Sequence, residues 1–132
     1  MVMNKTLFLI FNHQFTPQQD ADARASLGVE RVETMPTEIR QIWGNVPPDL
    51  SEIGGYLTPV KDWLAGHSRP GDVVLIQGDF GATCLMVRFA LELGLIPVYS
   101  TTRREAIEEH QTDGSVRMTH HFRHVRFRRY FG

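Results

Sequence analysis

Short apolar runs separated by helical patterns constrain the fold of this chain more than any other feature of its sequence. An apolar run of about five residues between turn signals is typical of a strand covered on both faces. Strands are expected at Leu7–Phe11, Val29–Glu33, Val73–Gln77 and Ile96–Ser100. Strands that alternate with helices predict an α/β fold, and right-handed crossovers favour an open, mostly parallel sheet with helices on both faces.

Helix signals fill the gaps between these runs. The stretch from Thr16 to Leu27 begins with the residues of a capping box and ends at a glycine. Further helices are expected over residues 36–43, 50–64 and 82–93. The second of these has apolar residues at helical spacing and predicts a core helix, which Pro59 would weaken or bend. Cys84, inside the last helix, is expected to be a buried, inert thiol.

The C-terminal segment, residues 103–132, differs from the rest of the chain. Asp113-Gly114 lies between two extended stretches and predicts a β-hairpin. The alternation of apolar side chains shifts between Phe122 and Val125, which indicates a bulge or bend. From Arg117 onward the tail has five arginines, three histidines and no acid. Such a tail suits a polyanion, a solvated sheet edge or a subunit contact, and the sequence leaves these alternatives open.

Length and charge narrow the class of protein. The 132 residues suit one domain, spanning residues 1–132. A net charge of −1 excludes a generally basic nucleic-acid coat, so no DNA partner is expected, although a local basic patch is compatible with it. The single cysteine forms no internal disulfide, and the first apolar run is too short for a signal peptide or a membrane span. The expected location is therefore the cytoplasm, with no membrane partner.

Polar segments follow three of the expected strands. If the strand order is 2-1-3-4, the topological switch lies between the first and third strands, and ligands bind beyond the carboxyl ends at that point. Asn12 and His13 follow the first strand. The imidazole of His13 suits a general acid or base near neutral pH, or a turn histidine bonded to backbone, and Asn12 fits ligand recognition or a turn equally well.

A glycine-containing loop follows the third strand and opens the next helix. Its residues are Gln77, Gly78, Asp79, Phe80, Gly81, Ala82 and Thr83. Free backbone N–H groups at such a helix start can face a phosphate or a ribose, but a plain tight turn has the same pattern. The loop is neither a dinucleotide fingerprint nor a P-loop. Asp79 would repel phosphate, so it is expected to cap the helix or to hold a hydroxyl.

Hydroxyl and guanidinium groups follow the fourth strand. These residues are Thr101, Thr102, Arg103 and Arg104. Arginine binds phosphate bidentately and threonine can position it, although one of the two arginines is expected to be merely solvated. A metal site is not predicted, because His120 and His124 would lie roughly 13 Å apart on one strand. No cofactor is predicted either.

Four ordered segments together resemble a small CRISPR-associated protein family of the Csx class. The segments are Phe11–His13 with Thr16 and Gln19, Gln77–Thr83, Thr101–Glu105 and Phe122–Arg128. The resemblance spans nearly the whole chain. It implies a stand-alone CRISPR-associated Rossmann-fold (CARF) domain that forms a homodimer and binds cyclic oligoadenylate, foremost cyclic tetra-adenylate. Members of this kind act as ring nucleases that switch off type III CRISPR antiviral signalling.

Under this interpretation the protein is a metal-independent ring nuclease in which a ribose 2′-hydroxyl attacks the adjacent phosphate. His13 would transfer the proton, Asn12 would position the ribose and Arg104 would stabilise the added charge. His124 and Arg126 of the tail would add ligand contacts. A non-catalytic protein that sequesters or senses the messenger is the alternative, and an unrelated nucleotide-binding enzyme is a third.

Overall fold

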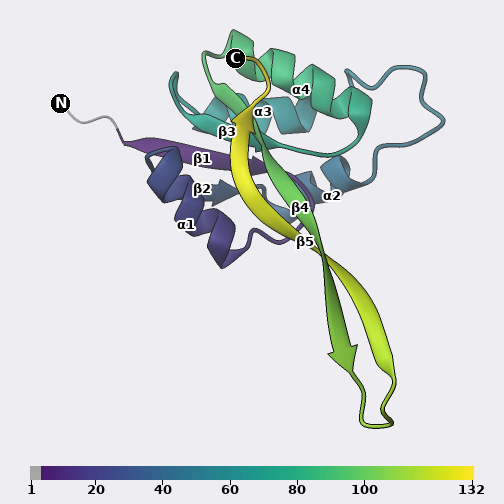
Figure 1. Cartoon of the computed structure of the whole chain (residues 1–132). Helices are drawn as coiled ribbons and strands as arrows, with labels where there is room; N and C mark the ends of the chain where they lie inside the picture. Colours follow the sequence, from purple (N-terminus) through teal and green to yellow (C-terminus); the bar gives the residue numbers. More distant parts are fainter. Residues whose placement is uncertain (1–3) are drawn as a thin grey trace.

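Five strands form one sheet in the order β2-β1-β3-β4-β5 in the computed structural model, which describes residues 4–132 (Figure 1). The strands are β1 (Lys5–Ile10), β2 (Val29–Thr34), β3 (Val73–Ile76), β4 (Ile96–His110) and β5 (Val116–Arg129). The first four strands run parallel, and β5 pairs antiparallel with β4. The predicted α/β fold, Rossmann-like with a C-terminal hairpin, is confirmed, and so is the strand order.

Helices cover both faces of this sheet. They are α1 (Pro17–Ser26), α2 (Thr37–Gly44), α3 (Thr58–His67) and α4 (Phe80–Glu92). Successive side chains of a strand point to opposite faces. Leu7 and Leu9 of β1 therefore pack with Ala23 of α1, whereas Phe8 and Ile10 pack against α2, α3 and α4.

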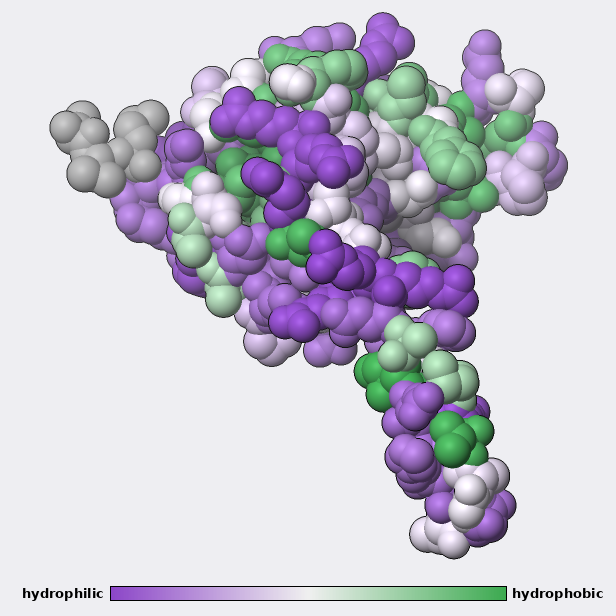
Figure 2. All heavy atoms as spheres, in the orientation of Figure 1, coloured by the Kyte–Doolittle hydropathy of each residue, from purple (hydrophilic) through white to green (hydrophobic). Residues whose placement is uncertain are grey.

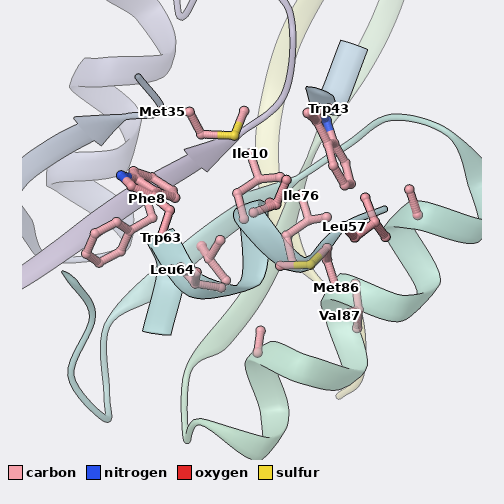
Figure 3. Close-up of a cluster of buried hydrophobic side chains, with 14 of the residues drawn as sticks. Phe8, Ile10, Met35, Trp43, Leu57, Trp63, Leu64, Ile76, Met86 and Val87 are labelled. Atoms are coloured by element: carbon pink, nitrogen blue, oxygen red, sulfur yellow. The ribbon is translucent and has the colours of Figure 1, made fainter. Parts of the chain in front are cut away.

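The core on the face of the three helices contains two tryptophans and several fully buried aliphatic side chains (Figure 3). Trp63 of α3 meets Phe8 of β1 edge to face, with 5.6 Å between ring centroids. Trp43 of α2 is 2% exposed, and its Nε1 donates a hydrogen bond to the carbonyl oxygen of Gln77 at 3.0 Å. This core therefore holds the residue that follows β3 in a fixed position.

Two helix starts carry the caps that the sequence predicts. Thr16 Oγ1 accepts a hydrogen bond from the backbone N–H of Gln19, and Oε1 of Gln19 accepts one from the backbone N–H of Thr16. Asp79 caps α4, with its Oδ2 accepting from the N–H of Ala82 at 3.0 Å. These caps determine where α1 and α4 begin, beside the carboxyl ends of β1 and β3.

The core helix predicted over residues 50–64 is wrong at its N-terminal half. Helix α3 begins at Thr58, and Leu50 is 45% exposed. Pro59 occupies the first turn of α3, where its missing N–H leaves no hydrogen bond unmade, so it starts the helix and does not bend it. Cys84 of α4 is also exposed, contrary to the predicted core position, because it lies on the outer face of its helix.

Strand β4 continues 10 residues beyond the predicted end at Ser100 and reaches His110. Thr101–Arg104, expected as a segment after the strand, therefore lies within β4 and pairs with β5. The distal parts of both strands form an arm that projects from the body (Figure 1). The predicted hairpin turn is present, with Gly114 at a φ of +86°. The pairing register shifts where Thr101 and Thr102 face Arg126 and His124, which confirms the predicted irregularity.

The arm exposes apolar side chains among charged ones (Figure 2). Ile107, Val116, Met118 and Phe122 are all more than 40% exposed. Within residues 4–132, no helix combines the length and the hydropathy needed to cross a bilayer.

Tyr130 is the residue after β5, and its phenol packs against the sheet. Its hydroxyl donates to the carbonyl oxygen of Ile76, and its ring lies 4.9 Å from that of Tyr99. Burial, with a smaller electrostatic effect of Tyr99, raises the pKa of Tyr130 to about 12 from an ordinary 10.0. The folded state therefore holds this proton more tightly than the unfolded chain does, and the associated stability is lost as pH rises from 10 to 12.

We expect the phenolate absorbance at 295 nm to include a step near pH 12 that disappears in Tyr130→Phe. The phenylalanine variant should also lose less stability than the wild type over the same alkaline range. A step near pH 12 that persists unchanged in Tyr130→Phe would show that this phenol is not the one held by burial.

Candidate functional site

Three cavities meet beyond the carboxyl ends of β1 and β3, at the topological switch of the sheet. Their volumes are about 740, 530 and 370 Å³. Gln77 lines all three cavities, and His13 lines the first two. The sequence-based expectation that the segments after β1 and β3 converge is therefore correct. The largest of the three has a volume in the ordinary range for a small-molecule site.

The 740 Å³ cavity, here called the arm pocket, lies between α1 and the base of the arm. Its lining comprises Phe11, His13, Gln14, Thr16, Pro17, Gln18, Gln19, Gln77, Ser100, Thr102, Glu105, Ile107, His121, Phe122, Arg123 and His124. Four side-chain amides, three hydroxyls and three imidazoles give it many neutral donors and acceptors. Among these lining residues, Arg123 is the only arginine or lysine, and Glu105 is the only carboxylate.

A chain of hydrogen bonds connects residues that line the arm pocket to Asp22 of α1. Ser100 Oγ lies 2.6 Å from Nδ1 of His124, and Nε2 of His124 lies 2.6 Å from Oδ2 of Asp22. Gln19 donates its side-chain N–H to Ser100 Oγ at 3.4 Å. Gln77 accepts the backbone N–H of Ser100 at 2.9 Å. The chain thus links α1, β4, β5 and the residue after β3.

Asp22 is ionised in this chain of hydrogen bonds. Burial alone would raise the pKa of Asp22, but hydrogen bonds from Ser26 and His124, together with the charges of His124 and Arg126, hold it below the ordinary 3.8. The stability that this carboxylate contributes is present above that ordinary pKa and is lost as pH falls through the lowered value. The side chain of His124 is only 4% exposed, so its hydrogen bond to Asp22 is shielded from water on the imidazole side.

The two smaller cavities use the loop after β3. Asn12, His13, Gln77, Gly78 and Asp79 contribute to the 530 Å³ cavity. Gly78 packs so closely on the indole of Trp43 that an added Cβ would lie 2.8 Å from its Nε1. The 370 Å³ cavity is lined by Gln77, Gly78, Phe80, Thr83, Tyr99 and Tyr130.

Thr83 is a polar residue that lines the 370 Å³ cavity. Its Oγ1 is buried and has no hydrogen-bond partner among the described residues. Phe80, on the same cavity, is 95% exposed. A buried hydroxyl without a hydrogen-bond partner costs free energy.

The structure brings together some of the predicted site residues and separates others. Those that line one of the three cavities are Asn12, His13, Gln77, Gly78, Asp79, Phe80, Thr83, Thr102 and His124. Those that line none of these three are Gly81, Ala82, Thr101, Arg103, Arg104 and Arg126. Asp79 and Phe80 lie on different cavities, so the loop does not present one continuous phosphate cradle.

The assignment of Arg104 to the site does not match the position of this residue in the arm. It pairs with Phe122 in the β4–β5 ladder, because the strand continues where a loop was expected. Arg123 of β5 supplies the guanidinium of the arm pocket in its place. Its Nη1 lies 3.8 Å from Oε1 of Glu105, and both side chains are well exposed, so this ion pair is weak and open to competition.

Several functional candidates were missed by sequence reasoning. Ser100 was assigned to a strand, and Gln18 and Asp22 fell within a predicted helix, without a functional role. A serine that ends an otherwise apolar strand is a usable signal, since such strands have little reason to bury a hydroxyl. The contact between Asp22 and His124 spans 102 positions in the sequence and has no local signature.

Comparison with known proteins places this architecture in a family. The family described as "Uncharacterized protein MJ1673 family" matches residues 5–128. The chain belongs to the MJ1673 family. The protein "Uncharacterized protein MJ1673" of Methanocaldococcus jannaschii is 47% identical over 124 residues, which cover 94% of this chain and 95% of that protein. No solved structure matches this member of the MJ1673 family.

Proposed function

We propose that this member of the MJ1673 family binds cyclic oligoadenylate, foremost cyclic tetra-adenylate, and cleaves it without a metal ion. The observation that supports this most directly is the arm pocket, a cavity rich in side-chain amides at the topological switch of a Rossmann-like sheet. The resemblance of the four sequence segments to the Csx class supplies the ligand class.

The chemistry of the lining suits adenosine. A side-chain amide can donate and accept at once, and glutamine or asparagine pairs bidentately with the N6 and N7 atoms of adenine. Gln14 and Gln77 line the arm pocket together with His13. Phe122 is 71% exposed at the same pocket and offers a face on which a base can stack. Arg123 offers a guanidinium to a phosphate.

The proposed reaction uses the nucleophile that RNA carries. The ribose 2′-oxygen attacks the adjacent phosphorus, the bond from phosphorus to the 5′-oxygen breaks, and the products carry a 2′,3′-cyclic phosphate and a 5′-hydroxyl. The exposed side chain of His13, in its protonated form, donates the proton that the departing 5′-oxygen takes up. Arg123, in the role that the sequence assigned to Arg104, stabilises the negative charge on the non-bridging oxygens of the phosphoryl group. Asn12 positions the ribose from the adjoining cavity.

A homodimer fits this ligand. A ring of four nucleotides has four phosphates, whereas one copy of the arm pocket presents one arginine. Two copies related by a two-fold axis would present the pocket residues to both halves of the ring. Because the proposed ligand is an intracellular messenger, we place the protein in the cytoplasm.

The function is tested by incubating the protein with cyclic tetra-adenylate in EDTA. We expect linear products that end in 2′,3′-cyclic phosphate, and no cleavage of a ring with 2′-deoxyribose. A mononucleotide that binds more tightly than the ring would instead indicate an unrelated nucleotide-binding enzyme. Equal cleavage of the deoxy ring would refute attack by the 2′-hydroxyl.

Single-turnover kinetics separate the nuclease from the non-catalytic alternative. With protein in excess over the ring, the nuclease converts all bound ligand. Stoichiometric binding with an unchanged ring would refute cleavage and establish a protein that sequesters or senses the messenger.

A further inference from the structure

We propose that Ser100, His124 and Asp22 form a proton relay in which Ser100 Oγ is an activated hydroxyl at the wall of the arm pocket. The inference rests on the proposed function for its substrate, the ribose 2′-hydroxyl of a phosphodiester, and adds the group that accepts that proton. The geometry of the relay does not depend on the proposed function. Two contacts of 2.6 Å connect a pocket hydroxyl to an imidazole and then to a carboxylate.

The direction of each hydrogen bond follows from the carboxylate. The ionised carboxylate of Asp22 only accepts hydrogen bonds, so Nε2 of His124 carries a proton. When the imidazole is neutral, which is the form that can accept a proton, Nδ1 is the acceptor and Ser100 Oγ donates to it. A hydroxyl beside an imidazole that a third group orients is the geometric signature of an activated oxygen.

Ser100 Oγ keeps one acceptor position for a substrate. A hydroxyl oxygen has two lone pairs, and Gln19 occupies one at 3.4 Å. The residue is 8% exposed and lines the arm pocket, so the second lone pair is the one that a ligand hydroxyl can reach. The backbone bond from Ser100 to Gln77 and the caps of α1 hold the oxygen in place.

The proton transfers of this step balance. The substrate 2′-hydroxyl gives its proton to Ser100 Oγ, and Ser100 gives its own proton to Nδ1 of His124. The 2′-oxygen forms its bond to phosphorus while the bond to the 5′-oxygen breaks. Asp22 stabilises the imidazolium that results, and the proton returns to bulk solvent after product release. His13, which has no part in this chain of bonds, remains the donor to the leaving oxygen.

The same contacts also hold β5 against α1, so a purely structural role must be separated from a catalytic one. Ser100→Ala keeps the backbone N–H that bonds Gln77 and removes only the hydroxyl. Asp22→Asn keeps the size of the side chain but leaves no negative charge for the imidazolium. We expect Ser100→Ala to lower kcat for ring cleavage about 100-fold or more while the Kd for cyclic tetra-adenylate changes less than about threefold. A structural role would instead change Kd and melting temperature together with kcat.

A second readout does not depend on ring cleavage. Diisopropyl fluorophosphate carries an electrophilic phosphorus, which an activated serine oxygen attacks with loss of fluoride and transfer of its proton to His124. We expect mass spectrometry to find one adduct, at Ser100, that is absent in Ser100→Ala and strongly reduced in His124→Gln and Asp22→Asn. Ser115→Ala is the matched control, because Ser115 bonds a carboxylate of Asp113 and no imidazole.

The two readouts distinguish failure of the relay from failure of the function. Labelling of Ser100 in a protein that leaves the ring intact would support the activated serine and refute the nuclease. Ring cleavage that is unchanged in Ser100→Ala, with no adduct at Ser100, would overturn the relay and leave the nuclease standing. Absence of both labelling and cleavage in the wild-type protein would overturn both.

Discussion

Replacing Trp43 with alanine is expected to lower the free energy of unfolding by about 3–5 kcal/mol. The indole is 2% exposed and packs in the same core cluster as Leu57 and Ile76 (Figure 3). Its removal leaves a cavity and also removes the donor that bonds the carbonyl oxygen of Gln77. Gly78 rests directly on the ring, so the loop after β3 would lose its support as well.

Urea unfolding followed by circular dichroism measures this loss. Trp43→Phe is the matched variant, because it keeps an aromatic ring in the core but has no N–H for Gln77, and we expect it to lose less stability than the alanine variant. Gln77 lines all three cavities, so both variants should also weaken binding of cyclic tetra-adenylate. A loss below about 1 kcal/mol in Trp43→Ala would show that the indole does not organise this core.

The layout of the sheet was predictable because its strands are buried on both faces. A strand such as β3 must be apolar at every position, so Val73–Ile76 is visible in the sequence and its crossover handedness follows. The extension of β4 was not predictable in the same way. Residues 101–110 lie in an arm exposed on both faces, where pairing with β5 satisfies the backbone and no apolar pattern is required.

The candidate site was predictable only where topology alone decides it. His13 and Gln77 meet because the carboxyl ends of neighbouring parallel strands lie side by side. The contact between His124 and Asp22 depends on how β5 lies against α1, across 102 positions of sequence that carry no local signal of it. Arg104 was assigned to the site because residues 101–104 were expected to follow a strand that ends at Ser100, whereas β4 continues through them.

Replacing Arg123 with alanine is expected to weaken binding of cyclic tetra-adenylate about 10-fold to 100-fold, the range of a charge-assisted hydrogen bond. Arg123 is the guanidinium that lines the arm pocket, and its bond to Glu105 is long enough, at 3.8 Å, for a phosphate to displace it. Because the side chain is 63% exposed before the ligand binds, added salt should reduce the difference between wild type and variant. Isothermal titration calorimetry at two salt concentrations measures both effects.

Two neighbouring substitutions separate the role of Arg123 from the general charge of the arm. Arg104→Ala removes the same charge from the same strand pair but outside the arm pocket, so its Kd should remain close to that of the wild type. Glu105→Gln removes a carboxylate that competes with phosphate for Arg123, so it should tighten binding. If Arg104→Ala weakens binding as much as Arg123→Ala, the ligand responds to the summed charge of the arm, and the arm pocket is not its site.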